Sequence, residues 1–357
     1  MTNHLPTLIA DRYEVAGTVL AGGMASVLPC KDRVLDRWVA IKVMPGSADL
    51  RRIRDELRAL LKMRSKHVVQ VYDILRLNKD DLAIVQEFID GNDLFDEAHM
   101  PKTQDQFLKL VWQIASGIAD IHALGVIHRD IKPNNMKIDS EGVVKIFDFG
   151  LARDEGEGAS TVGFVGTPGF AAPELYAAHA KFTAAVDTYA FGATAIFLGL
   201  RNLPDELKQR PPVFAGADYF ASFPYKLADE VEDSLSSCLS PSPANRPLMR
   251  DVRNVLAKHL LYDRHKALVV FKGEATYLDA SRRSVGLRLP SMGEVEIRYD
   301  GFCFQVHSVS GDVFLNNRQV VIGDVLPGAC VIALGSPDKR NKRKYITFDL
   351  SHPEIVL

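Results

Sequence analysis

The chain has 357 residues, of which 47% are hydrophobic and 25% are charged, and its formal net charge is −2. This length accommodates two domains, each with its own buried core. A nearly neutral chain has no overall attraction for nucleic acid or an anionic membrane, so we expect neither as a partner. We also expect no membrane span, because no uncharged apolar run reaches the ~18 residues that crossing a bilayer requires.

The cysteines and the first residues favour a cytoplasmic location. The four cysteines are scattered without a C-x-x-C pair, which suits a reducing compartment better than a disulfide framework. Residues 1–6 lack the basic and then apolar regions of a signal peptide. We therefore expect a cytoplasmic protein.

Two lobes are predicted from the change in pattern along the chain. Residues 1–10 are expected to be an N-terminal extension, and residues 11–90 to be mostly strands broken by turns. The exception is 48–64, a charged stretch with apolar residues at helical spacing. Residues 91–262 are mainly helical in pattern. A strand-rich segment before a helix-rich one predicts a small and a large lobe within 11–262.

The clearest helix is predicted to begin after Thr103, a candidate N-cap, and to end before Gly125. Further helices are predicted at 184–199, 226–238 and 247–262. The apolar stripe of the first helix consists of Phe107, Leu108, Val111, Ile114, Ala115, Ile118 and Ile121.

The last segment, residues 267–357, contains strand and turn patterns. Alternating apolar runs such as 295–299 end at turn residues. We place the domain boundary at 263–266. The predicted fold class is therefore α+β, with a two-lobed domain over 11–262 followed by a small all-β sandwich domain.

The apolar strand 39–42 ends in a lysine, which by itself is typical of a solvated strand end. Glu56 follows fourteen residues later on a predicted helix. Phosphoryl transfer needs a fixed cation on the α- and β-phosphates, and a carboxylate holds a long lysine side chain in place. Lys42 and Glu56 are candidates for this pair, and Asp55 is the competing carboxylate.

The segment 128–135, His-Arg-Asp-Ile-Lys-Pro-Asn-Asn, follows the long helix, and Pro133 keeps it non-helical. Here Asp130 can accept the hydroxyl proton of a substrate, and Lys132 can neutralise the γ-phosphate. Asn135 can offer a neutral oxygen to Mg²⁺. Five specified positions at this spacing rarely occur together by chance.

Thirteen residues beyond Asn135, Asp148 is followed by Phe149 and Gly150. Alone, this tripeptide is typical of a strand that ends in a turn. At this spacing, Asp148 is a second candidate ligand of Mg²⁺. Phe149 is expected to pack beneath it, and Gly150 gives the backbone freedom to move.

Three further residues are assigned structural roles. They are Glu174 in Ala-Pro-Glu, Asp187 in Asp-Thr-Tyr-Ala-Phe-Gly and Arg246 in Asn-Arg-Pro. Glu174 and Arg246 are expected to form a buried bidentate pair within the large lobe.

In this order, the motifs resemble those of the eukaryotic-like (Hanks-type) Ser/Thr protein kinases, closest to the bacterial members, over about two-thirds of the chain. The resemblance implies ATP and Mg²⁺ as cofactors, protein serines and threonines as substrates, and autophosphorylation in a signalling role. It implies that Asp130 is the base, that Lys132 contacts the γ-phosphate, and that Asn135 and Asp148 bind the metal. Lys132 and Thr167 match the Ser/Thr branch rather than the tyrosine branch.

The resemblance also implies a nucleotide site with Gln86 as gatekeeper and the backbone of 87–89 against the adenine. The family pattern has glycine at 20, 22 and 25, but Leu20 and Ala25 replace two of the three. We expect this to alter the affinity for ATP without loss of the chemistry. The residues assigned to the nucleotide are Leu20, Gly22, Gly23, Val27, Ala40, Lys42, Glu56, Glu87 and Ile89.

The segment 148–174 is predicted to be a regulatory switch. Ser160 and Thr161 lie in a glycine-rich, acidic stretch and are the predicted autophosphorylation sites. Arg129 is the type of residue that clamps a loop phosphate. Thr167 is expected to bond the catalytic residues instead.

Residues 313–335 are similar to the second half of a forkhead-associated (FHA) β-sandwich, over about half of the last domain. The phosphothreonine-reading residues of that family do not match, because Ser-x-x-His is missing and the usual Asn-Gly pair is Asn316-Asn317. We expect an FHA-like fold that packs on the kinase or contacts a protein partner.

The basic run 339–344 lies between two predicted strands. A solvated hairpin loop is the favoured interpretation, and a docking patch for acidic or phosphorylated partners is the alternative.

Two other functions compete with an active protein kinase. The divergent glycine-rich loop is the support for a pseudokinase scaffold that acts through its β domain. A small-molecule kinase is disfavoured by Ala-Pro-Glu at 172–174 and by Gly-Thr-Pro at 166–168, which shape a peptide-binding surface.

Overall fold

The computed structural model describes residues 8–16, 20–21, 26–44, 60–77, 82–149, 168–177, 183–213, 218–351, 353 and 355. The chain forms two compact units that divide between Leu256 and Ala257. This division lies within helix α5 (Met249–Leu260), ahead of the predicted boundary at 263–266. None of the described helices combines the length and the apolarity that a membrane crossing demands.

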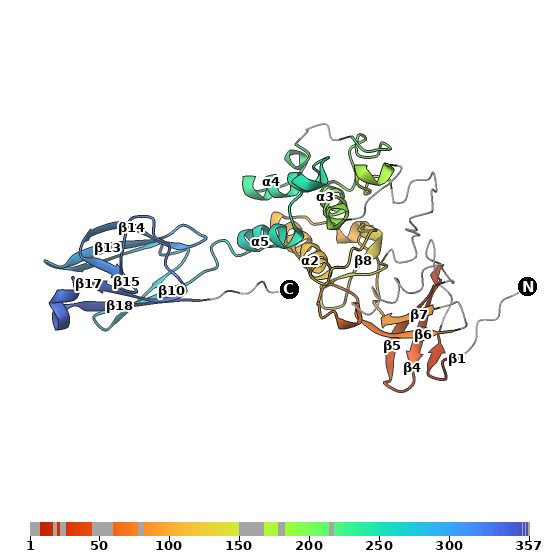
Figure 1. Cartoon of the computed structure of the whole chain (residues 1–357), viewed down its shortest axis with the longest axis horizontal. Helices are drawn as coiled ribbons and strands as arrows, with labels where there is room; N and C mark the ends of the chain where they lie inside the picture. Colours follow the sequence, from red (N-terminus) through yellow and green to blue (C-terminus); the bar gives the residue numbers. More distant parts are fainter. Residues whose placement is uncertain are drawn as a thin grey trace, which may run out of the picture. The chain divides into compact units, whose positions relative to one another are not determined.

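The first unit begins with an antiparallel sheet of order β1-β2-β4-β5-β7-β6, in which β3 pairs with β4 (Figure 1). Its strands are β1 (Leu8–Ile9), β2 (Tyr13–Val15), β3 (Leu20–Ala21), β4 (Ser26–Asp32), β5 (Arg37–Met44), β6 (Val71–Arg76) and β7 (Leu82–Glu87). Val39 and Ile41 belong to the buried core on one face of the sheet. Because strand residues alternate between faces, Ala40 and Lys42 lie on the other face. Val27 lies beside them, because it pairs directly with Lys42.

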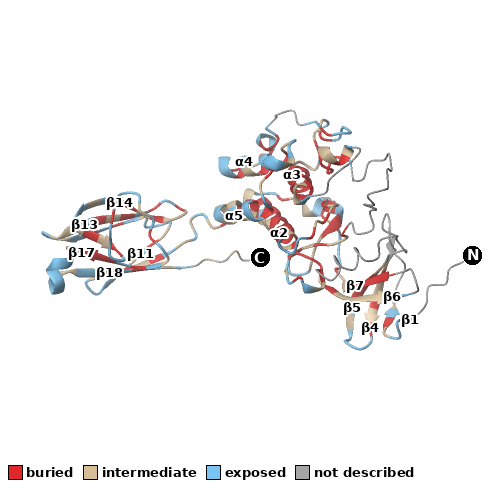
Figure 2. Ribbon diagram, in the orientation of Figure 1, coloured by how far each residue is buried: buried red, intermediate tan, exposed pale blue. Residues whose placement is uncertain are grey.

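Four described α-helices follow the sheet along the chain, and Figure 2 shows α2 and α3 as largely buried. Thr103 caps α2 as predicted, since its hydroxyl accepts a hydrogen bond from the Gln106 amide at 3.3 Å. The predicted start of α4 at 226 is three residues too early, because Ala228 is still extended, with φ −76° and ψ 144°. The helices are α2 (Gln104–Ala123), α3 (Ala184–Leu200), α4 (Asp229–Cys238) and α5.

A short two-stranded sheet carries the catalytic segments. It consists of β8 (Met136–Ile138) and β9 (Val144–Ile146). The segment that Pro133 was predicted to keep non-helical instead forms a short 3₁₀ turn, Pro133–Asn135, directly before β8. Proline is tolerated there because it occupies the first position of the turn, where its missing N–H costs no hydrogen bond. The segment that begins at Phe147 follows β9, so β8 and β9 place two sequence motifs side by side.

The second unit contains two antiparallel sheets around one core. One sheet has the order β11-β10-β18-β17-β15-β16, and the other has the order β12-β13-β14. Buried side chains of both sheets, such as Ile297 and Phe348, share the core. The strands are β10 (Ala267–Phe271), β11 (Glu274–Leu278), β12 (Ser284–Leu289), β13 (Gly293–Tyr299), β14 (Phe304–Gly311), β15 (Val313–Leu315), β16 (Arg318–Gln319), β17 (Ala329–Leu334) and β18 (Lys344–Leu350).

Candidate active site

Two predicted catalytic residues converge on the carboxylate of a third, Asp130. Lys132 Nζ lies 2.9 Å from Asp130 Oδ2. Asn135 Nδ2 donates to the same oxygen at 2.9 Å and to the Asp130 carbonyl oxygen at 2.8 Å. Asn135 is buried, so these bonds fix its amide. The loop thereby holds a carboxylate in place with an amine beside it, as expected for a base next to a phosphate contact.

The His128 side chain stabilises this loop through both of its ring nitrogens. It is fully buried, and its Nε2 atom lies 3.0 Å from the Phe147 carbonyl oxygen. The Asp130 amide donates to His128 Nδ1 at 3.3 Å. One nitrogen therefore donates and the other accepts, which only a neutral imidazole can do. Burial lowers the pKa of His128, in agreement with the neutral form.

Asp187 fixes the backbone of the same loop from helix α3. Its carboxylate accepts the amides of His128 and Arg129, both at 2.8 Å, and lies 2.9 Å from His122 Nε2. Arg129 has φ +70°, a left-handed conformation that costs a non-glycine residue energy. Asp187, predicted to be structural, thus stabilises the strained turn that presents Asp130.

The buried imidazole predicts a pH dependence of stability. The unfolded chain binds a proton on His128 below about pH 6.5, whereas the folded chain resists this because burial lowers the pKa. The free energy of unfolding is therefore unaffected by His128 above about pH 6.5. Below that pH it decreases, by at most about 1.4 kcal/mol per pH unit. Burial lowers the pKa of His67 too, which adds in the same direction.

Urea unfolding from about pH 7.5 to about pH 5.5 checks this expectation. The His128→Asn variant keeps a donor and an acceptor but cannot titrate, so its stability should fall less steeply with decreasing pH. Equal slopes for the two proteins would contradict the assignment of a buried neutral imidazole.

Lys42 on β5 meets Asp148, which lies just after β9. Lys42 Nζ forms an ion pair with Asp148 Oδ1. The side chain of Lys42 is 12% exposed and that of Asp148 is 45% exposed. Ala40 and Val27 line the same face of the sheet as Lys42. Three residues predicted to contact a nucleotide therefore share one face of the sheet, and one of them is paired with a predicted metal ligand.

An ion pair that the sequence reasoning missed joins the end of β7 to β9. Lys145 Nζ lies 3.0 Å from Glu87 Oε1, and Glu87 Oε2 accepts the Gln70 amide at 3.1 Å. Lys137 Nζ donates to the Ile89 carbonyl oxygen at 3.2 Å. These contacts hold the segment predicted to face the adenine. No local spacing could have indicated them, because 58 residues separate Glu87 from Lys145.

The donor set fits a hard cation held together with phosphates. The amide nitrogen of Asn135 is committed to Asp130, which leaves its oxygen for a ligand role. Asp148 uses one carboxylate oxygen on Lys42 and keeps a second one. Two oxygen ligands from the protein, completed by phosphate and water, are typical of Mg²⁺ sites in phosphotransferases.

Several predicted site residues lie outside the described part of the chain. Among them are the partner proposed for Lys42, two loop glycines and the three hydroxyl residues of the regulatory segment. The backbone of Leu20 belongs to β3, whereas its side chain is not described. The undescribed residues are Gly22, Gly23, Asp55, Glu56, Gly150, Ser160, Thr161 and Thr167.

The predicted pair of Glu174 and Arg246 is present. Arg246 Nη1 and Nη2 donate to the two carboxylate oxygens of Glu174 at 2.7 and 2.8 Å. The guanidinium also donates to the carbonyl oxygens of Ala185, Ser240 and Pro241. The Arg246 side chain is 0% exposed, so the pair ties α3 and the segment before α5 to the Ala-Pro-Glu motif.

Comparison with known proteins assigns the family. The protein kinase domain family matches residues 13–256. Human cyclin-dependent kinase-like 2 is 30% identical over 282 residues, which cover 68% of this chain and 57% of that protein. The probable serine/threonine-protein kinase pknA2 of Bifidobacterium longum is 35% identical over 205 residues, covering 54% of this chain and 27% of that protein. The serine/threonine-protein kinase drp72 of Corynebacterium efficiens is 37% identical over 203 residues, covering 53% of this chain and 38% of that protein.

The fold and the site are of the protein kinase class, and the chain belongs to the protein kinase domain family. It spans a little over half the length of the first of these relatives. The structure of Rad53 1–466 in complex with AMP-PNP has a similar fold, with a TM-score of 0.55 and 23% identity over 68% of this chain and 64% of that one.

Proposed function

We propose that this chain is a Ser/Thr protein kinase that transfers the γ-phosphoryl group of ATP to serine and threonine hydroxyls of proteins. The observation that carries the proposal is the convergence of Lys132 and Asn135 on Asp130, together with the ion pair between Lys42 of β5 and Asp148. We include a signalling role and a cytoplasmic location in this proposal. The four cysteines are free, which suits a reducing compartment.

Each proposed catalytic residue has a separate role in phosphoryl transfer. Asp130 orients the attacking hydroxyl and accepts its proton, while Lys132 offsets the charge on the transferred group. Lys42 anchors the α- and β-phosphates. Asn135 and Asp148 would hold Mg²⁺, which supplies further charge neutralisation at the phosphates. Because the protein groups are held before the substrate binds, little reorganisation accompanies the reaction.

A radiolabelled-ATP assay with Mg²⁺ separates this proposal from a pseudokinase scaffold. The full chain should label itself or a generic protein substrate, and Asp130→Asn should remove the incorporation. ATP binding without any transfer by the wild-type chain would favour the scaffold, whose support is the replacement of two loop glycines by Leu20 and Ala25.

We expect autophosphorylation at Ser160 or Thr161. Both follow a glycine-rich, acidic stretch, and Arg129 beside the catalytic base is suited to pair with a phosphate. Mass spectrometry of the purified active protein checks this. Both residues unmodified, together with full activity of the Ser160→Ala/Thr161→Ala variant, would refute the prediction.

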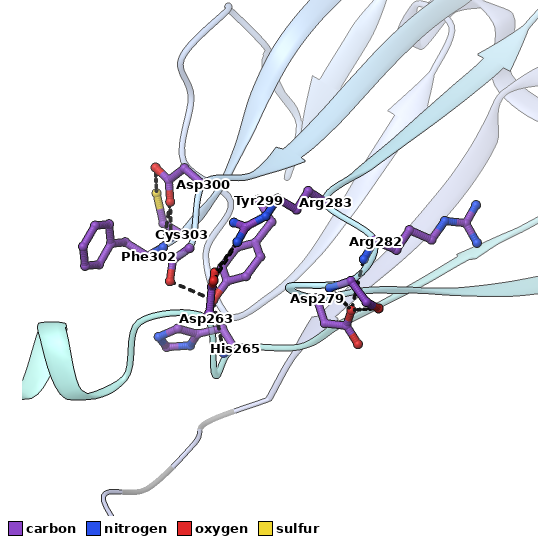
Figure 3. Close-up of polar contacts among 11 residues, drawn as sticks. Asp263, His265, Asp279, Arg282, Arg283, Tyr299, Asp300, Phe302 and Cys303 are labelled. Carbon is purple, nitrogen blue, oxygen red and sulfur yellow. Dashed lines mark hydrogen bonds and ion pairs between the residues drawn. The ribbon is translucent and has the colours of Figure 1, made fainter. Parts of the chain in front are cut away.

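We further propose that the second unit is FHA-like in fold but does not read phosphothreonine in the usual FHA manner. Arg283 donates to both carboxylate oxygens of Asp263 at 2.8 and 2.6 Å, so its charge is already neutralised (Figure 3). Arg282 extends away from this pair in the same view. The Asn316 side chain accepts the Val331 amide at 3.0 Å, a structural role.

Calorimetric titration of the full chain with a phosphothreonine peptide library tests this point. We expect no phosphate-dependent binding, because lost charge-assisted bonds of roughly 1.5–3 kcal/mol each would leave little affinity. Micromolar binding that disappears on dephosphorylation would contradict it. The expected role of the unit is contact with a protein partner.

A further inference from the structure

The basic run 339–344 concentrates positive charge in a unit that is otherwise balanced. Residues 267–357 contain eleven Lys and Arg and ten Asp and Glu, and five of the cations lie within these six positions. The run connects β17 to β18 and includes most of the 3₁₀ turn Pro337–Lys342, which Figure 2 shows as exposed. Lys339 has one acidic neighbour, Asp338, at 3.9 Å.

Arg343 is anchored, unlike a side chain of a merely solvated loop. Its Nε atom donates to the Gly335 carbonyl oxygen at 2.9 Å. Its guanidinium lies 5.4 Å from the Phe314 ring centroid and 5.6 Å from that of Tyr345. Cation–π contacts of this kind hold the charge in a fixed place. Its Nη2 atom is covered and has no hydrogen-bond partner among the described residues, so one strong donor is without an acceptor.

The two aromatic rings belong to an apolar outer face of the six-stranded sheet. Phe314 and Tyr345 both pair with Ala333, from opposite sides, so the three residues share one face. Val331, two residues from Ala333 on β17, lies on that face as well. Val331 is 42% exposed and Tyr345 is 58% exposed. Ile332, by contrast, points into the core.

We propose that this surface binds an acidic segment of a partner polypeptide that carries an apolar side chain beside its carboxylates. We name it the basic-aromatic face and define it as Phe314, Val331, Tyr345 and the basic run 339–344. The carboxylates of the segment meet the exposed cations of the basic run, beside the guanidinium that Gly335 and the two rings hold in place. The apolar side chain covers Val331 and the Tyr345 ring, which single charges would leave exposed.

A polypeptide fits this surface better than a nucleic acid does. Nucleic-acid sites use basic residues spread along a groove or a helix to follow a phosphate backbone. Here the cations are confined to one turn, and Val331 on the adjoining strand is aliphatic. Asp349, which lies on the same face of β18 as Tyr345, would repel an extended polyanion.

The test uses the full chain and fluorescence anisotropy. The probe is a short fluorescein-labelled peptide with a run of glutamates followed by leucine and phenylalanine. We expect Lys339→Glu/Lys342→Glu to weaken binding by about tenfold or more, and Tyr345→Ser to weaken it as well. Arg288→Glu is the matched control, because Arg288 is 72% exposed on β12 of the other sheet and its reversal should leave binding unchanged.

Three results would overturn the proposal. One is the absence of peptide binding by the wild-type chain. The second is equal binding by Lys339→Glu/Lys342→Glu and Arg288→Glu, which would show that the basic run is only solvated. The third is binding of a single-stranded oligonucleotide, or of vesicles that contain phosphatidylserine, in preference to the peptide. Thermal melts of each variant exclude unfolding as the cause, and none of the outcomes depends on kinase activity.

Discussion

Asp148→Ala is expected to reduce phosphoryl transfer by at least about a thousandfold while the kinase domain stays folded. The change removes the carboxylate that pairs with Lys42, which is also a proposed oxygen ligand for the metal. The Asp148 side chain is 45% exposed, so its loss opens no cavity in the core. Initial rates of radiolabel transfer to a generic substrate measure the effect.

The same chemical change at an exposed position is the control. Asp205 is 95% exposed, and Asp205→Ala should keep wild-type rates. Lys42→Met should reduce the rate by orders of magnitude as well, because it removes the cation that we propose anchors the α- and β-phosphates. Undiminished transfer by Asp148→Ala in a metal-dependent assay would rule out the assigned role.

Glu174→Gln is expected to destabilise the kinase domain by about 3–5 kcal/mol, because it leaves the guanidinium of Arg246 buried without its counter-charge. The Arg246 side chain is 0% exposed and cannot turn to water without disrupting the segment around it. In a domain of this size, the expected decrease in melting temperature is about 10 °C.

The measurement is a thermal melt that resolves the transition of the kinase domain. Glu14→Gln removes a carboxylate from an exposed pair with Arg33 and should leave that transition unchanged. A similar decrease in melting temperature for both variants would show that the buried pair stabilises the domain no more than the exposed pair does.

The sequence predicted best those groups whose geometry follows from short spacing. Asp130, Lys132 and Asn135 lie within six residues of one another, so a single loop conformation places them together. The helix α2 was predicted with its N-cap, because Thr103 is followed directly by the apolar stripe. Periodicity and capping are local properties, and a single sequence contains them.

Contacts between distant segments were accessible only through the family resemblance, or not at all. Glu174 and Arg246, 72 positions apart, were paired because their motifs resemble those of known kinases. The hydrogen bonds of Asp187 to the catalytic loop and the pair of Arg283 with Asp263 were missed. No spacing rule specifies which elements meet in three dimensions, so these contacts required the structure.

The most direct test of the central claim is phosphoamino-acid analysis of protein labelled by the purified full chain with radiolabelled ATP and Mg²⁺. We expect label on phosphoserine and phosphothreonine for the wild-type chain and none for Asp130→Asn. Label on phosphotyrosine alone, or equal labelling by Asp130→Asn, would contradict it.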